Sequence, residues 1–288
     1  MSWEERKVLV TGGDGFIGSN LVTRLAKEGA VVTTLSKRND SLAHEHYNVD
    51  ISKPIPSNYL KGCEVVFHLA GIADPKICER NPDVAFSVNT IGTLNVLEAC
   101  RKNNIEKVVF SSSAHVYGRP LYVPIDEGHP LAPSTVYGRS KAAAEHICMN
   151  YGATILRFFN VYGPNQKGSF LIPTILSQLG KKEISLMNFS SKRDFIYIND
   201  VINALLLSAD YGGDYFNIGS GRSYSAREIT LIICSIAKKQ PKLREIGETS
   251  GVRDLVADIR KAKKLLRWRP KTSLESGLKK VVNSIRCD

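Results

Sequence analysis

The glycine-rich run Thr11-Gly12-Gly13-Asp14-Gly15-Phe16-Ile17-Gly18 is the clearest indication of the fold in this sequence. It follows a short apolar run at 7–11 and precedes a segment at 20–29 whose apolar residues recur with helical spacing. Glycines three residues apart between a strand and a helix permit a tight turn and let the backbone approach a pyrophosphate, which the helix N–H groups can bind. The stretch therefore predicts a dinucleotide-binding turn. The residues expected against the coenzyme are Gly12, Gly15, Phe16, Ile17 and Gly18.

The alternation of strand and helix continues along the first half of the chain. Further strands are expected at 31–35, 65–70, 107–112 and 154–159, with helices at 85–103 and 137–150. Strands that alternate with helices form a parallel sheet covered on both faces. We therefore predict an α/β fold, a doubly wound parallel Rossmann sheet with a smaller C-terminal α/β substrate domain.

The alternation loosens beyond residue 163. Helices are expected at 170–179, 198–209 and 226–239, strands at 183–187 and 215–218, and two basic helices close the chain. We expect a dinucleotide-binding Rossmann domain at 1–163, to which 193–220 returns, and a smaller substrate-binding domain at 164–288.

Composition limits the class of protein. A chain of 288 residues with 43% hydrophobic residues can bury a large core. No apolar run has the length of a signal peptide or of the ~20 residues that a spanning helix needs. The six cysteines are scattered, without the close pairs that hold zinc or form a redox couple. We expect a cytoplasmic protein with reduced thiols, no metal and no membrane partner.

The formal net charge of +11 is concentrated near the C-terminus, where residues 238–288 hold 15 Lys and Arg against 6 Asp and Glu. Such an excess can bind nucleic acid, or it can belong to a solvated helical face and a site for an anionic substrate. Because no nucleic-acid-binding motif accompanies the charge, we favour the second interpretation and expect no nucleic acid partner. A non-catalytic coenzyme sensor or nucleic-acid-binding scaffold is the competing class of function.

The end of the expected second strand bears on the choice of coenzyme. A site for NAD normally carries a carboxylate here that binds the adenosine ribose hydroxyls, whereas this chain has Ser36, Lys37 and Arg38. An acid would repel a 2′-phosphate, but a hydroxyl beside two cations can bind it. We expect NAD(P), with NADP favoured over NAD; the alternative is that the two cations only solvate a loop. Further residues expected beside the coenzyme are Asp50, Ile51, Leu69, Ala70 and Gly71.

Tyr137 and Lys141 lie four residues apart and share one face of the expected helix at 137–150. A phenol with an ordinary pKa near ~10 is a poor base, but a nearby ammonium and an oxidised nicotinamide favour its ionised form. A serine run at 111–113 ends a strand at the sheet edge where the coenzyme is expected. Together these features predict that Tyr137 transfers a proton while a hydride moves.

Seven short motifs follow one another along the chain: TGGDGFIGS, HLAG, NTIGT, SSSAHVYG, YGRSK, RFFNVYGP and KRDFIYINDV. In this order they resemble the extended short-chain dehydrogenase/reductase family, and more closely its nucleotide-sugar epimerase/dehydratase group with its UDP-glucose 4-epimerase-like members. The match runs over nearly the whole chain, through a tail, ADIRKAKKLLRWRP, that is similar to the family's. These motifs are specific indicators of the fold and of the type of coenzyme, but they do not identify the individual sugar.

The resemblance implies a role for each matching residue. Tyr137 would be the acid or base, Lys141 would hold the nicotinamide ribose and lower the pKa of Tyr137, and Ser113 would hydrogen-bond the reacting sugar oxygen. Asn89 would be the family's buried helix asparagine, for which a purely structural role competes. The residues expected to contact the substrate are Ser113, His115, Asn160, Arg193 and, in place of an absent family arginine, Arg253.

The chain also departs from the family pattern. Dehydratases of the family carry an Asp-Glu pair after the reactive serine, where this chain has Ala114 and His115. The departure argues against dehydration, and His115 is then expected to pack or hydrogen-bond rather than to catalyse. The chain is short for an epimerase, and the trimming falls in the substrate domain.

Two reactions stay open, both on a nucleoside-diphosphate sugar. The SSSAHVYG and YGRSK contexts favour reversible hydride transfer at C4 of an NDP-hexose, as in a UDP-sugar 4-epimerase. Ser36, Lys37, Arg38 and the compact second domain favour the alternative, an NADPH-dependent reductase of an NDP-4-keto sugar. The resemblance also implies a homodimer, in which the helices that carry NxxGT and YxxxK pack against their copies. A small-residue face on the second of these helices fits such packing, although burial within the chain explains the same residues. That face comprises Ala142, Ala143, Ala144 and Ile147.

Overall fold

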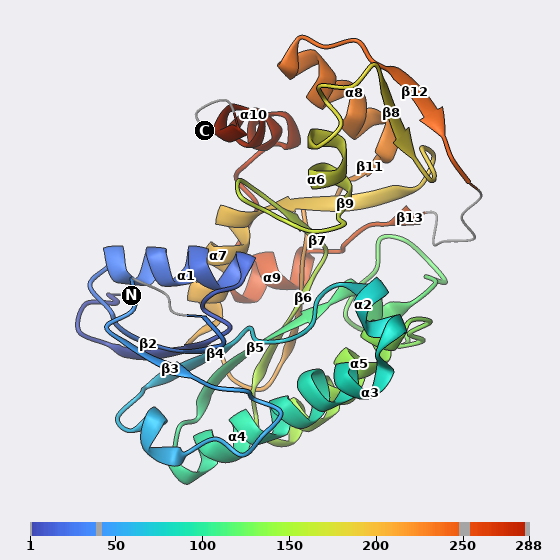
Figure 1. The fold of residues 1–288 in the computed structure, drawn as a ribbon. Helices are drawn as coiled ribbons and strands as arrows, with labels where there is room; N and C mark the ends of the chain where they lie inside the picture. The colour runs from blue at the N-terminus through green and yellow to red at the C-terminus, as the bar shows by residue number, and fades with distance from the viewer. Residues whose placement is uncertain (1, 39–41, 248–253, 286–288) are drawn as a thin grey trace.

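The computed structural model describes residues 2–38, 42–247 and 254–285. Figure 1 shows a large central sheet with helices on both faces, and a smaller α/β part above one edge of that sheet. Within the part of the chain described, no helix is both long and apolar enough to cross a membrane.

Seven parallel strands form the central sheet in the order β10-β6-β5-β4-β1-β2-β3. Their bounds are β1 Lys7–Thr11, β2 Val31–Ser36, β3 Glu45–Asn48, β4 Val65–His68, β5 Lys107–Ser113, β6 Thr154–Phe158 and β10 Tyr215–Ile218. In β1, Val8 and Val10 enter the core on one face and Leu9 the core on the other, because successive side chains of a strand alternate. The predicted Rossmann sheet is confirmed, and its strand order reverses between β1 and β4, where such folds bind ligands.

Helices cover both faces of this sheet (Figure 1). One face carries α1 (Phe16–Lys27) and α7 (Ile198–Ser208), which pack against each other. The other carries α4 (Gly92–Lys102) and α5 (Val136–Asn150), flanked by the short α2 (Pro75–Arg80) and α3 (Pro82–Phe86). The catalytic candidates Tyr137 and Lys141 lie in the first two turns of α5, so that helix brings them to the edge of the sheet.

The smaller part holds two further sheets. One contains β7 (Asn160–Tyr162), β9 (Lys192–Tyr197), β11 (Ser223–Ser225) and β13 (Asp254–Leu255); in the other, β8 (Glu183–Leu186) pairs with β12 (Lys242–Glu245). The helices of this part are α6 (Leu171–Leu176), α8 (Ala226–Ala237) and α10 (Leu274–Ile285), while α9 (Arg260–Leu265) packs on β10 of the central sheet. The segment expected to return at 193–220 is split between the two parts, because β9 joins the small sheet and β10 the central one. The division of the chain into two domains at residue 163 stays a prediction.

The single helix expected at 85–103 is interrupted. A π-helical turn, η2 (Ser87–Ile91), separates α3 from α4. Within it the Asn89 amide accepts from Ile72 N at 2.7 Å and donates to Ile72 O at 3.1 Å and to Ser140 Oγ at 3.0 Å. These bonds tie the chain after β4 to helix α5, and turns of this kind often lie near functional sites.

Candidate active site

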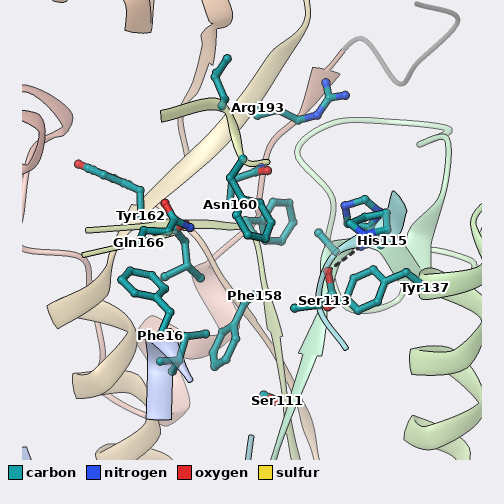
Figure 2. Close-up of a pocket in the computed structure, with 18 of the residues that line it drawn as sticks. Phe16, Ser111, Ser113, His115, Tyr137, Phe158, Asn160, Tyr162, Gln166 and Arg193 are labelled. Atoms are coloured by element: carbon teal, nitrogen blue, oxygen red, sulfur yellow. Dashed lines mark hydrogen bonds between the residues drawn. The ribbon is translucent and has the colours of Figure 1, made fainter. Parts of the chain in front are cut away.

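A cavity of about 500 Å³ opens at the carboxyl ends of β1, β4, β5 and β6 and reaches under the small sheet (Figure 2). Many of the residues expected from the sequence line it together: Gly12, Gly15, Phe16, Ile17, Gly18, Leu69, Gly71, Ser113, His115, Tyr137, Lys141, Asn160 and Arg193. The lining does not include Ser36, Lys37, Arg38, Asp50, Ile51 and Ala70. Arg253 lies outside the described residues. The role of each residue remains a prediction.

The glycine turn fits a pyrophosphate. Gly12 has φ +70°, and a Cβ there would lie 2.8 Å from Ala70 Cα, so both the conformation and the space exclude a side chain. A Cβ on Gly18 would lie 2.0 Å from Gly12 O. Gly15 caps α1 without a side-chain hydrogen bond, which leaves the first-turn N–H groups for an anion. The turn therefore offers the cradle that a dinucleotide requires.

At the end of β2, the Ser36 hydroxyl and the Arg38 guanidinium already have hydrogen-bond partners within the chain. Ser36 is buried and donates through Oγ to Arg38 O at 2.9 Å, and Lys37 is exposed. Arg38 donates through Nε to Asp14 Oδ2 at 3.1 Å. One of the two cations thus contacts an acid of the glycine turn.

Three other residues expected beside the coenzyme, Asp50, Ile51 and Ala70, form hydrogen bonds with neighbouring residues of the chain. Asp50 accepts from Ser52 N and Ser52 Oγ, which lowers the pKa of its carboxyl. Ile51 is buried, and its carbonyl accepts from Asn95 Nδ2 at 2.8 Å. Ala70 N donates to Thr11 Oγ1 at 3.1 Å. These bonds fix the loops around the predicted adenosine end of the site.

Ser113, His115 and Tyr137 lie side by side at one wall of the cavity (Figure 2). Ser113 caps the short helix η3 (Ala114–Tyr117) by accepting from His115 N at 3.3 Å. The rings of His115 and Tyr137 meet edge to face, with centroids 5.4 Å apart. Burial raises the pKa of Tyr137 to about 12, and a hydrogen bond with Ser113 offsets part of that rise. In this structure the Tyr137 phenol is therefore protonated at neutral pH.

Lys141 lies behind Tyr137 on the same face of α5. Its Nζ donates to Ser111 O at 2.7 Å and lies 4.5 Å from the centre of the Phe110 ring. Burial lowers the pKa of this ammonium to about 8. Within the chain itself, burial of the phenol has the largest effect on the pKa of Tyr137. The lowering of that pKa by Lys141 stays a prediction.

His115 is neutral at physiological pH. Burial, helped by the positive charge of Arg193, lowers its pKa to about 4. A ring that stays uncharged and packs on Tyr137 agrees with the expectation that His115 packs rather than catalyses.

The far wall of the cavity comes from the small sheet. Asn160 at the start of β7 donates through Nδ2 to Asp194 O at 3.1 Å. Arg193 in β9 donates through Nη1 to Ser191 Oγ at 2.5 Å and to Lys192 O at 2.7 Å. Burial lowers the pKa of Arg193, and Asp254 offsets part of this. A half-buried guanidinium beside the cavity is a suitable partner for an anionic group of a ligand.

Several residues that line the cavity were not predicted from the sequence. Gln166 donates through Nε2 to Val161 O at 2.9 Å, and Lys167 and Phe170 are exposed at the cavity. The polar run Asn165-Gln166-Lys167 directly after the RFFNVYGP motif was the available signal. Phe158, Phe195 and Leu255 also line the cavity, but their spacing gives no hint of it.

A buried histidine connects the glycine turn to the π-helical turn. Thr93 Oγ1 donates to Asn89 O at 2.7 Å and lies 3.0 Å from His68 Nε2, so Nε2 must carry the proton. His68 Nδ1 then accepts from Thr11 Oγ1 at 2.7 Å. The hydrogen bonds thus favour neutral His68, and burial lowers its pKa to about 3.

This assignment predicts a stability change with pH. The folded pKa of His68 lies below the ordinary ~6.5, so the unfolded chain binds the extra proton as pH falls from about 6.5 towards 3. From pH 7 to pH 5 the free energy of unfolding should fall by about 2 kcal/mol through this residue alone. In urea titrations, His68→Gln should lose that share of the decline. An unchanged decline in the variant would show that His68 is not the titrating group.

The fold and the site define a dinucleotide-dependent enzyme: a glycine turn lies at the reversal of a parallel sheet, and Ser113, Tyr137 and Lys141 gather beside it. Residues 8–219 match the NAD dependent epimerase/dehydratase family. The chain belongs to this family and is an NAD-dependent enzyme, and the resemblance drawn from its motifs is confirmed.

Individual relatives cover almost the whole chain. A Methanocaldococcus jannaschii protein that carries the provisional name UDP-glucose 4-epimerase is 36% identical, over 96% of this chain and 97% of its own. The dTDP-4-dehydro-6-deoxyglucose reductase of Escherichia coli is 30% identical over 100% of both chains. The solved structure of MoeE5 with UDP-glucose and NAD superimposes with a TM-score of 0.92 at 30% identity, covering 98% of this chain and 99% of its own.

Proposed function

We propose that the protein is a nucleotide-sugar 4-epimerase that inverts C4 of an NDP-hexose, with a UDP-hexose as the favoured substrate. The observation that carries the proposal is the wall formed by Ser113 and Tyr137, with Ala114 and His115 at the positions where dehydratases of the family carry acids. Relatives named for UDP-glucose support the choice of nucleotide.

In this proposal Ser113, Tyr137 and Lys141 have different roles. Ser113 Oγ positions the sugar O4, and Tyr137 takes the O4 proton and later returns it. Lys141, whose pKa is about 8, supplies positive charge behind the phenol. A nicotinamide held beside them by Lys141 would supply the acceptor and donor of the C4 hydride. Because burial raises the pKa of Tyr137, the phenol would ionise only beside additional positive charge, which an oxidised nicotinamide would supply.

The far wall of the cavity bears on how the sugar could turn over. Epimerisation requires the 4-keto sugar to present its other face before hydride returns, while the nucleotide stays held. Arg193, Asn160 and Gln166 on the far wall are placed to hold the diphosphate side. The cavity of about 500 Å³ is lined by the glycine turn as well as by this far wall, so the nicotinamide and the hexose would share it.

The coenzyme choice is also a proposal. We favour NADP over NAD because the end of β2 carries the Ser36 hydroxyl and two cations instead of an acid. Titration of the purified protein with NADPH and NADH should give the lower Kd for NADPH. A lower Kd for NADH would contradict this preference.

The alternative function is an NADPH-dependent reductase of an NDP-4-keto sugar. The same end of β2 favours it, as does the likeness to a dTDP-4-dehydro-6-deoxyglucose reductase. In that reaction Tyr137 would supply a proton and not take one, and the oxidised coenzyme would leave after each turnover.

One experiment separates the two reactions. The protein is incubated with UDP-glucose or UDP-galactose and a trace of coenzyme, and the products are resolved by chromatography. An epimerase forms the C4 epimer with catalytic coenzyme. Failure to form it, together with stoichiometric oxidation of NADPH by an NDP-4-keto sugar, would establish the reductase instead.

We also propose a cytoplasmic homodimer. Ala142, Ala143 and Ile147 on α5 are half-buried within the chain, whereas Ala144 is fully buried. Intrachain packing therefore accounts for part of the small-residue face, and the rest is available to a second copy. A mass by light scattering equal to one chain would contradict the dimer.

A further inference from the structure

The ion pair between Asp14 and Arg38 bridges two parts of the predicted coenzyme site. Asp14 lies in the glycine turn, directly before Gly15, which caps α1. Arg38 follows the end of β2, and its Nε donates to Asp14 Oδ2 at 3.1 Å. The two segments are held together at their base, since Gly12 N donates to Leu35 O at 2.8 Å. The pair thus lies where a Rossmann fold places the adenosine ribose, between the glycine turn and the second strand.

A carboxylate at this position has opposite consequences for the two coenzymes. A ribose 2′-hydroxyl can donate to Asp14, as it does to the acid that NAD sites usually carry at the end of the second strand. A 2′-phosphate bound by Arg38 would instead lie close to the Asp14 carboxylate, and the two negative charges repel. Asp14 is thus a candidate, on the other side of the site, for the role of the acid that Ser36 replaces.

We propose that Asp14 is a coenzyme-selecting residue that favours NAD and opposes the preference for NADP given by Ser36, Lys37 and Arg38. The protein then accepts both dinucleotides, with Kd values within about tenfold of each other. This inference rests on the proposed coenzyme site. Binding is its direct readout, so no sugar substrate has to be known.

The pair is able to open. The Arg38 side chain is 79% exposed and Asp14 19% exposed, and ion pairs so exposed to water contribute little stability. The bond uses Nε, one of five donors of the guanidinium, so Arg38 can turn towards a phosphate. The cost is that Asp14 loses its cation just as a second anion arrives.

The test compares Asp14→Asn with Arg38→Gln and with Glu106→Gln. Asparagine keeps an oxygen that can accept from Arg38, so the turn is preserved while its charge is removed. Glu106 is an exposed acid at the amino end of β5, the opposite edge of the sheet, and gives a charge-matched control. The Kd values for NADPH and NADH are measured by fluorescence of the reduced coenzyme, and thermal unfolding confirms that each variant is folded.

Asp14→Asn should tighten NADPH by about tenfold while NADH binds equally or more weakly, a scale expected for charges a few ångströms apart near water. Arg38→Gln should weaken NADPH and leave NADH nearly unchanged, and the control should change neither. If Asp14→Asn shifts both Kd values together, or neither, Asp14 does not select the coenzyme, although the proposed coenzyme site would stand. A wild-type protein that binds neither dinucleotide would overturn that site and this inference together.

Discussion

Tyr137→Phe is expected to lower kcat for the sugar reaction by about 10²- to 10⁴-fold, the range for loss of a general acid or base. The ring stays, so its edge-to-face packing with His115 and its burial are preserved and only the hydroxyl is lost. The Kd of the coenzyme should change little. The measurement is steady-state turnover of a verified nucleotide sugar, with coenzyme binding measured on the same preparation.

Tyr47→Phe is the matched control for this variant. Tyr47 stacks on Tyr59 and donates to Glu45 Oε2 at 3.2 Å, in β3. It also loses one phenol hydroxyl, and its turnover should stay near that of the wild type. If Tyr137→Phe keeps full turnover, another group moves the proton, and the chemistry assigned to the wall of Ser113 and Tyr137 is wrong.

Glu145→Gln is expected to lower the free energy of unfolding by about 3 to 5 kcal/mol, the usual result of leaving one buried charge without its partner. Glu145 on α5 accepts from Arg157 Nη2 at 2.7 Å and Nε at 3.0 Å, with both side chains at most 3% exposed. Burial acts to lower the pKa of Arg157, but its bonds to Glu145 raise it above the ordinary value. The guanidinium thus stays charged when the carboxylate is removed.

Glu183→Gln provides the comparison in urea titrations. Glu183 lies 3.7 Å from Arg244 in an ion pair whose side chains are 39% and 67% exposed, so its loss should change stability only slightly. Equal effects in the two variants would mean that the buried pair contributes no more than a surface pair.

The buried pair also concerns the active site. Ser112 Oγ donates to Glu145 Oε1 at 2.5 Å, and Ser112 precedes Ser113 in β5. Glu145 lies one turn beyond Lys141 in α5. The pair therefore fixes the strand that carries Ser113 against the helix that carries Tyr137 and Lys141.

The sequence alone was sufficient where local rules decide the outcome. The glycines at 12, 15 and 18 and the alternating strands predicted the sheet, and the spacing of Tyr137 and Lys141 placed both on one face of α5. The strand 215–218 was predicted with its observed bounds. These features depend on short-range geometry and on periods of hydrophobic residues.

Other features depend on contacts between distant segments. At the π-helical turn, Asn89 bonds to Ile72 and Ser140, which are distant in the sequence. No local sequence pattern predicts these bonds. The pair of Asp14 and Arg38 joins residues 24 apart and changes how the end of β2 is understood. The pKa of Tyr137 follows from its burial, which only the packed fold defines.

The most direct measurement of the proposed function follows the hydrogen at C4. UDP-glucose that carries deuterium at C4 is incubated with the protein and a trace of coenzyme, and the C4 epimer is analysed by mass spectrometry. We expect the epimer to retain the deuterium, because the hydride removed from C4 is the one returned. An epimer that lost the label to water, or no epimer with net oxidation of NADPH by a 4-keto sugar, would contradict the assignment.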